Sequence, residues 1–182
     1  MFRKDLSEEI SGQNLAKTSV KKKMKQQLLN QYPSLETFIQ DLFQKKNSIV
    51  VIKCSNKIQL FAFNNTVLFF SIRDGPFFPT LKLLHSYPDI LPPIQVDEGA
   101  IRHIIGGADV MIPGLISKGG KLPEENIPKG SMIAIMAEDK KHALGIGVLE
   151  VETSQIPVVK KGVAAQTIHH LTDGLWNYIS EK

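Results

Sequence analysis

The sequence has a single cysteine, Cys54, among its 182 residues. One cysteine excludes an internal disulfide and any site that is built from clustered thiolates. Because Cys54 follows the apolar run 49–52, we expect it to pack in a core rather than to react. No stretch approaches the roughly 20 apolar residues that a membrane span needs, and the N-terminus carries no long apolar run. These absences predict a soluble protein with a cytoplasmic location and no membrane partner.

The signatures of catalysis, nucleotide binding and metal binding are also missing. The run 119–122 ends in leucine, where a phosphate-binding P-loop needs a hydroxyl residue, and the run 145–147 lacks the third glycine of a dinucleotide fingerprint. None of the five histidines has a partner at a zinc-like spacing. His169 and His170, if they lie on a strand, should point one inward and one outward. We therefore expect no catalytic residue, no metal and no cofactor.

The positive charge is concentrated in one half of the chain. The formal net charge is +4, but residues 1–91 contain thirteen Lys and Arg against seven Asp and Glu, and the remainder contains nine against eleven. A polyanion would therefore be attracted chiefly by the first half. The second half would have to bind it through local geometry.

The N-terminal segment predicts an arm followed by a basic helix. Residues 1–16 are polar and lack helical periodicity, so only packing on the rest of the protein would order them. From Thr18 or Ser19 as the capping residue, apolar side chains recur every four positions and indicate an amphipathic helix. Its basic side chains are Lys21, Lys22, Lys23 and Lys25. These lysines either form a solvated face or contact an RNA backbone, and charge alone does not separate the two interpretations.

A second helix and a sheet should follow. Ser34 can cap a helix with a continuous apolar face, and strand-like runs occur at 49–54, 58–63 and 66–72. Short polar connections of the hairpin type join these runs, so they predict an antiparallel meander. Pro79 suits the first position of a short third helix.

A stiff connector separates this region from the rest. Pro88, Pro92 and Pro93 restrict the backbone and remove hydrogen-bond donors. We therefore predict a domain boundary here, between an N-terminal α+β domain of helices on the meander, residues 1–91, and a second domain, residues 92–182.

The stretch from Val96 to Gly114 predicts a helix, a glycine corner and a strand. Asp97 can cap the helix, and Gly106 and Gly107 supply a left-handed end. The helix carries an apolar stripe that consists of Ala100, Ile101, Ile104 and Ile105. The run 110–112 then indicates a strand that Pro113-Gly114 should stop. At the corner, two residues without side chains should leave main-chain N–H groups open to phosphate or ribose oxygens.

This stretch resembles the PUA domain, together with Lys129-Gly130, the run 132–136 (Met-Ile-Ala-Ile-Met) and the run 144–148 (Leu-Gly-Ile-Gly-Val). The resemblance extends from about residue 92 to 173. It implies a PUA-type small β-barrel with a short helix, and it implies RNA binding. The whole chain is then expected to be of the α+β class.

Further motifs resemble one narrower family over the whole chain. They are Phe69-Phe70, the run 75–85 (Gly-Pro-Phe-Phe-Pro-Thr-Leu-Lys-Leu-Leu-His), Tyr87-Pro88, the run 168–171 (Ile-His-His-Leu) and the run 174–176 (Gly-Leu-Trp). With them the sequence is similar to the malignant T-cell-amplified sequence family of translation factors.

The resemblance implies a non-catalytic RNA-binding translation factor. Such factors form a heterodimer with density-regulated protein and act on the small ribosomal subunit, in contact with tRNA or rRNA. The implied roles are reinitiation, unusual initiation and release of deacylated tRNA. One alternative is an RNA-modification enzyme or accessory subunit that uses its PUA domain for tRNA binding. Another is a protein-interaction adaptor that has lost RNA binding.

Seven residues of the PUA-like half are the candidate RNA site. Arg102 is the charge expected to face a phosphate, and Gly106, Gly107 and Ala108 form the corner for close approach. The wall of the site would consist of Met111, Pro113 and Gly114. The alternative is that the glycines only end a helix and that Met111 belongs to the core.

Overall fold

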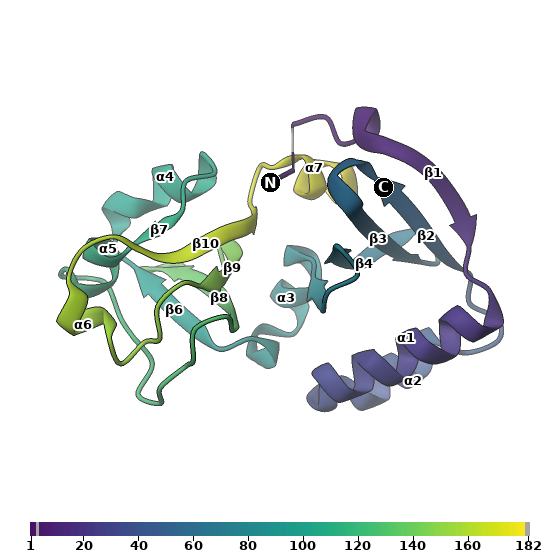
Figure 1. The fold of residues 1–182 in the computed structure, drawn as a ribbon, viewed down its shortest axis with the longest axis horizontal. Helices are drawn as coiled ribbons and strands as arrows, with labels where there is room; N and C mark the ends of the chain where they lie inside the picture. Colours follow the sequence, from purple (N-terminus) through teal and green to yellow (C-terminus); the bar gives the residue numbers. More distant parts are fainter. Residues whose placement is uncertain (3, 181–182) are drawn as a thin grey trace.

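The computed structural model describes residues 1–2 and 4–180. It contains two five-stranded sheets, which lie toward opposite ends of the longest axis of the molecule (Figure 1). The N-terminal sheet has the order β1-β2-β3-β4-β5, and the C-terminal sheet has the order β6-β8-β9-β10-β7. Within the described part of the chain, no helix is long and apolar enough to cross a membrane.

The N-terminal sheet is antiparallel throughout. Its strands are β1 (Ile10–Leu15), β2 (Ile49–Cys54), β3 (Ile58–Phe63), β4 (Thr66–Ile72) and β5 (Phe77–Pro79). The predicted meander is confirmed, and β2, β3 and β4 have the predicted bounds. Asn64 and Asn65 form the β3–β4 turn with φ angles of 48° and 68°, which suit a two-residue hairpin loop.

The described residues of the arm, 1–2 and 4–16, are ordered by packing on the rest of the protein, as expected, but the sequence did not predict that residues 10–15 form strand β1. This strand pairs with β2 at the edge of the sheet, and most of its side chains are exposed. Ladder hydrogen bonds therefore stabilise β1, and an apolar alternation that could have revealed it is absent. Earlier in the arm, Phe2 and Leu6 are buried in the core.

Helices α1 (Thr18–Gln31) and α2 (Glu36–Leu42) pack against this sheet, as the apolar periodicity predicted. The rings of Tyr32 and Phe69 lie 5.9 Å apart, and those of Phe43 and Phe63 lie 5.5 Å apart. The predicted capping residues are wrong, because the N-caps are Lys17 and Leu35 and neither makes a side-chain cap hydrogen bond. Packing on the sheet, rather than side-chain capping, holds these helices.

Pro79 ends β5 and does not open a helix, contrary to the prediction. Phe77 and Phe78 extend along β4, and Pro79 is tolerated because β5 is an edge strand. The helix begins two residues later as α3 (Leu81–Ser86), where the Thr80 hydroxyl accepts a hydrogen bond from the N–H of Leu83.

The C-terminal sheet is mixed. Its strands are β6 (Pro93–Val96), β7 (Val110–Met111), β8 (Met132–Ala137), β9 (Gly145–Leu149) and β10 (Val163–His170). β6 runs parallel to β8, and the other pairs are antiparallel. Pro93, which the sequence placed in a connector, is the first residue of the edge strand β6, a position where its missing N–H is tolerated.

Among the described residues, the helices of the C-terminal part are α4 (Ile101–Ile105), α5 (Ile112–Ile116), α6 (Ile156–Val159) and α7 (Gly174–Ser180). Short 3-10 helices occur at Ser7–Glu9, Pro33–Leu35, Ser55–Lys57, Pro88–Ile90 and Glu98–Ala100. The strand predicted over residues 110–112 ends one residue earlier, at Met111, and Pro113-Gly114 lies inside α5 instead of ending the strand. Proline fits the first turn of a helix, where its missing N–H would have no helical partner.

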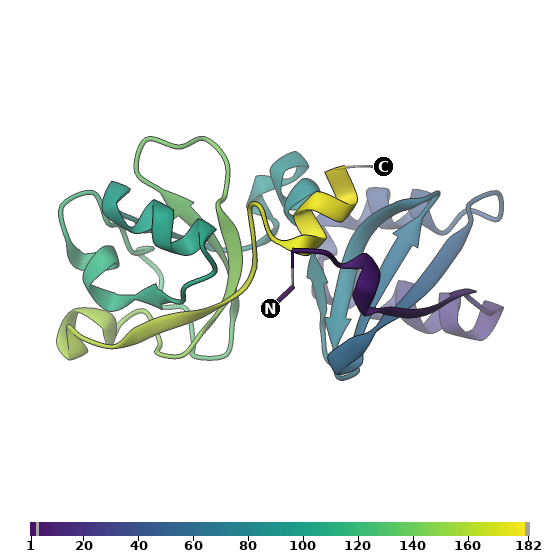
Figure 2. The same ribbon diagram turned by 90° about the horizontal axis from the view of Figure 1, so that it is seen from above.

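The two sheets meet at a packed junction. The N-terminal core also contains Ala134, Ala143, Ile146, Ile168 and Leu175 from the C-terminal part. Helix α7 lies at this junction beside α3, where the chain has returned toward the N-terminal sheet (Figure 2). On α3, Nε2 of His85 donates to the carbonyl oxygen of Ala143 at 2.9 Å. The junction therefore combines apolar packing with a hydrogen bond between the two parts.

The prediction that one of His169 and His170 points outward is wrong, because both are buried. The His169 ring packs against Phe2 and Phe70 of the N-terminal part, and the His170 ring lies against Gly107. The two rings are covered by different parts of the protein. Alternation along the strand therefore exposes neither of them.

Candidate nucleic-acid interface

Asp97 is the N-cap that the sequence predicted, and it caps the 3-10 helix Glu98–Ala100 that leads into α4. Oδ1 of Asp97 accepts a hydrogen bond from the N–H of Ala100 at 2.9 Å. A 3-10 turn follows, and then α4 itself, which buries Ile104 in the C-terminal core. The other carboxylate oxygen of Asp97 accepts from the Ser117 hydroxyl, so Asp97 ties the start of α4 to the end of α5.

The glycine corner ends α4 but does not offer free N–H groups. The N–H of Gly106 donates to the carbonyl of Arg102 at 3.1 Å, that of Gly107 to Ile104 at 2.9 Å, and that of Ala108 to His103 at 2.9 Å. With Gly107 at a φ angle of 89°, this is the Schellman arrangement of a helix end. The expectation that these amides would bind phosphate is therefore wrong, because the helix already uses them.

Gly107 also permits a close contact within the protein. A Cβ at this position would lie 3.2 Å from Nε2 of His170. The absence of a side chain at Gly107 thus allows the His170 ring to pack against the end of α4.

On one side of α4 lies a cavity of about 560 Å³, here called the α4–α5 cavity. Its lining residues are Asp97, Gly99, Ala100, His103, Ile104, Ala108, Asp109, Met111, Pro113, Gly114 and Ser117. Four predicted site residues, Ala108, Met111, Pro113 and Gly114, are therefore brought together. Met111 is 49% exposed, so the alternative that it belongs to the core is wrong.

On the other side of α4 lies an open groove, here called the Arg102–Lys140 groove. It is lined by Glu98, Gly99, Ile101, Arg102, Ile105 and Lys140. Arg102 and Lys140 are both exposed, and Nε of Arg102 donates to Nε2 of His103 at 3.3 Å. Two cations against one carboxylate make this groove suited to an anion.

Several lining residues were missed by the sequence reasoning. His103 follows Arg102 directly, and its place on the same exposed helix was a signal that could have found it. Asp97 and Asp109 also stabilise the fold through hydrogen bonds. Oδ1 of Asp109 accepts a hydrogen bond from the N–H of Thr167 at 2.9 Å. Lys140 reaches the groove from the turn between β8 and β9, and no local sequence pattern predicts that contact.

The basic helix lies far from α4. Figure 1 places α1 and α4 toward opposite ends of the molecule. Lys22 and Lys23 are exposed, whereas Lys21 and Lys25 are half-buried. Nζ of Lys21 donates to the carbonyl of Asn47 at 3.4 Å. The four predicted lysines therefore do not form one uniform solvated face, and they do not share a site with Arg102.

The described residues, 1–2 and 4–180, contain no group of three or more His, Cys, Asp or Glu side chains that could hold a metal ion. The candidate interface thus consists of α4, the hollows on its two sides and the separate basic helix.

Comparisons with known proteins cover nearly the whole chain. A family model described as a Pre-PUA-like domain matches residues 4–88, and one described as "elF2D, PUA domain" matches residues 91–174. Malignant T-cell-amplified sequence 1 of Danio rerio is 44% identical over 179 residues, which cover 97% of each chain. Translation machinery-associated protein 20 of Saccharomyces cerevisiae is 42% identical over 182 residues, covering 100% of each chain.

The chain belongs to the malignant T-cell-amplified sequence family.

A solved structure agrees with the fold of this family member. A PUA domain protein from Aeropyrum pernix superposes with a TM-score of 0.70 at 21% identity, over 93% of this chain and 91% of that one. In this malignant T-cell-amplified sequence family protein, α4 and both hollows lie within the region matched by the PUA model, and α1 lies within the Pre-PUA-like region.

Proposed function

We propose that this protein is a non-catalytic RNA-binding translation factor that acts in the cytoplasm on the small ribosomal subunit, as a heterodimer with density-regulated protein. Its roles would be reinitiation, unusual initiation and release of deacylated tRNA. The observation that carries the proposal is the pair of hollows on the two sides of α4, one cationic and one largely apolar. The names of its relatives, which include translation machinery-associated protein 20, support a role in translation.

The Arg102–Lys140 groove supplies the phosphate contacts in this proposal. The two side chains come from α4 and from the β8–β9 turn, so they can hold one anionic backbone from two directions. Arginine can bind a phosphate through two N–H groups, and lysine acts as a point charge. Contacts of this kind position an RNA without reading its sequence.

The α4–α5 cavity would take a nucleobase or ribose. Its volume of about 560 Å³ falls within the range of roughly 300 to 1,000 Å³ that is common for small-molecule sites. Met111 and Pro113 offer apolar contact to a ring, and His103 offers a polar ring edge. The carboxylates of Asp97 and Asp109 favour the hydroxyl and amino groups of a nucleoside over its phosphate.

The lysines of α1 would form a second contact with tRNA or rRNA. Of the two interpretations of these lysines, the RNA contact is the one we propose for Lys22 and Lys23, because both are exposed. We also retain the division into units 1–91 and 92–182, with α7 packed back on the first. No arrangement within the described residues favours the alternative of an RNA-modification enzyme or accessory subunit.

The salt dependence of binding tests the proposal. The double variant Arg102→Gln, Lys140→Gln should bind small ribosomal subunits carrying tRNA more weakly. The slope of log affinity against log salt should fall by about 0.7 to 0.9 for each phosphate contact removed. The double variant Lys45→Gln, Lys46→Gln, which removes two exposed charges after α2, is the matched control. An unchanged slope in the double variant, with the fold intact, would remove α4 from the RNA interface.

A further inference from the structure

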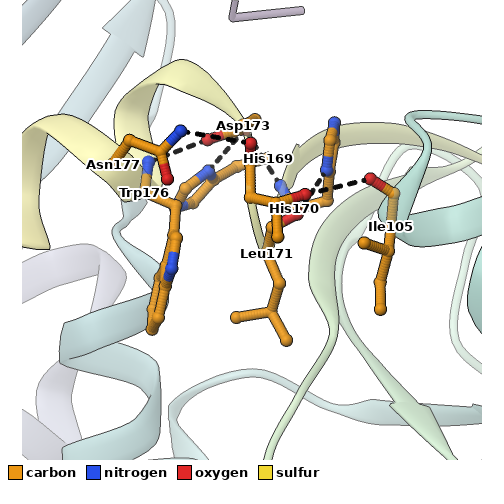
Figure 3. A network of polar contacts seen from close by, with 8 residues as sticks. Ile105, His169, His170, Leu171, Asp173, Trp176 and Asn177 are labelled. Atoms are coloured by element: carbon orange, nitrogen blue, oxygen red, sulfur yellow. Dashed lines mark hydrogen bonds and ion pairs between the residues drawn. The ribbon is translucent and has the colours of Figure 1, made fainter. Parts of the chain in front are cut away.

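The segment 169–173 touches both halves of the molecule within five residues. It ends β10 and leads into α7, and Figure 3 shows its polar contacts from close by. On one side it enters the aromatic core of the N-terminal part. On the other side it contacts the end of α4.

The contact with the N-terminal part is made by His169. Its side chain is fully buried, and its ring lies edge-to-face with Phe2 at 5.8 Å and with Phe70 at 5.9 Å between centroids. Phe70 in turn stacks on Phe78 of β5 at 5.1 Å. A polar ring from the C-terminal strand is thus inserted among the aromatic rings of the other half.

Asp173 holds that ring in place. Nδ1 of His169 lies 2.8 Å from Oδ2 of Asp173. The same carboxylate accepts from the N–H of His170 at 3.0 Å and from the N–H of Trp176 at 2.8 Å, the latter at the start of α7. Burial alone would raise the pKa of Asp173, but these hydrogen bonds and the neighbouring His169 hold it below its usual value. The carboxylate is therefore kept charged where it joins β10, His169 and α7.

The contact with α4 is made by the residues between His169 and Asp173. Nδ1 of His170 donates to the carbonyl of Leu171 at 2.8 Å, which directs Nε2 of the same ring toward Gly107. The Thr172 hydroxyl donates to the carbonyl of Ile105, the last residue of α4, at 3.3 Å. The end of α4 is thereby bound to the same short segment that fills the N-terminal core.

We propose that the buried His169–Asp173 pair is a positioning element that fixes the orientation of α4 and its two hollows relative to the N-terminal domain. This inference rests on the proposed function, because it concerns how the two candidate RNA surfaces cooperate. The lysines of α1 and the hollows beside α4 lie toward opposite ends of the molecule, as Figure 1 shows. Two linked contacts strengthen each other only when their span matches the target, and the gain reaches roughly 10² to 10⁴-fold in affinity. A rigid junction preserves that gain.

Asp173→Asn in the full chain tests the proposal. The amide keeps one acceptor oxygen, so it removes the charge beside His169 and one of the two carboxylate acceptors that the main-chain N–H groups of His170 and Trp176 use. Spin labels at Gln40→Cys and Glu124→Cys, one exposed position in each half, report the distance between the halves. The native Cys54 should stay unlabelled, because burial and the nearby Glu9 raise the pKa of its thiol to about 11. Asp89→Asn, at an exposed carboxylate, is the matched control.

We expect Asp173→Asn to broaden the distance distribution and to weaken binding to small ribosomal subunits at least tenfold. Its affinity for a tetranucleotide RNA, too short to reach both halves, should stay within twofold of the unmodified protein. Phe2→Ala, which removes one ring from around His169, should broaden the same distribution and serves as the second variant if Asp173→Asn does not fold. An unchanged distribution in the folded variants would overturn the proposal. So would a parallel loss of both affinities, since that marks general destabilisation.

The two arms separate this inference from the proposed function. Failure of the unmodified protein to bind either RNA probe would count against the proposed function. The distance measurement needs no RNA, so it still decides whether the pair fixes the junction.

Discussion

At Gly107 the backbone has a φ angle of 89°, and a Cβ there would lie 3.2 Å from Nε2 of His170. Its N–H group donates to the carbonyl of Ile104. Gly107 therefore has a structural role: it ends α4, and it leaves room for the His170 ring. The Gly107 amide is thus not free to bind RNA. The neighbouring Gly106 has a φ angle of −77°, which any residue can adopt.

Replacement of these two glycines should therefore have unequal effects. Gly107→Ala should lower the free energy of unfolding by about 1 kcal/mol or more, because alanine must adopt a left-handed conformation and meets the His170 ring. Gly106→Ala should change it by well under about 1 kcal/mol, since its backbone is already helical. Urea unfolding monitored by circular dichroism measures both. Equal losses from the two substitutions would contradict the assignment of Gly107.

At the scale of elements, α1 presents its lysines in two environments. Lys22 and Lys23 are exposed, whereas Lys21 is half-buried and bonded to Asn47. The double variant Lys22→Gln, Lys23→Gln should weaken binding to small ribosomal subunits and reduce the salt slope by up to about 0.7 to 0.9 per contact. Lys45→Gln, Lys46→Gln removes two exposed charges from the loop after α2 and is the control. If both double variants behave alike, the lysines of α1 form only a solvated face.

The elements that the sequence predicted well have an apolar pattern within their own residues. Strands β2, β3 and β4 are apolar runs bounded by polar turns, and α1 and α2 repeat their apolar residues with helical spacing. The elements it missed lack such a pattern. β1 is an exposed edge strand, β6 begins with proline, and α6 is a four-residue helix, so long-range pairing and packing define them.

The same distinction applies to the candidate site. Ala108, Met111, Pro113 and Gly114 line one cavity partly because they are close in the chain, so a local reading could find them. Lys140 meets Arg102 only through the folding of the sheet, and His170 meets Gly107 in the same way. Whether a glycine amide is free depends on whether it already has a hydrogen-bond partner, and the sequence alone does not predict that partner.

At the scale of the whole molecule, the chain crosses the junction twice and closes it with α7. The N-terminal core includes residues from both halves, among them Ile146, Ile168 and Leu175. Figures 1 and 2 show α7 at this junction and α1 and α4 away from it. This arrangement places the lysines of α1 and the hollows beside α4 on two separate surfaces. The packed junction keeps the distance between these surfaces fixed.

The most direct test of the central claim is an electron cryomicroscopy structure of the protein bound, with density-regulated protein, to the small ribosomal subunit carrying tRNA. We predict that an RNA phosphate lies within hydrogen-bonding distance, about 3 Å, of Arg102 or Lys140, with a nucleoside in the α4–α5 cavity. A complex in which α4 faces solvent or protein, with both hollows free of RNA, would contradict the account.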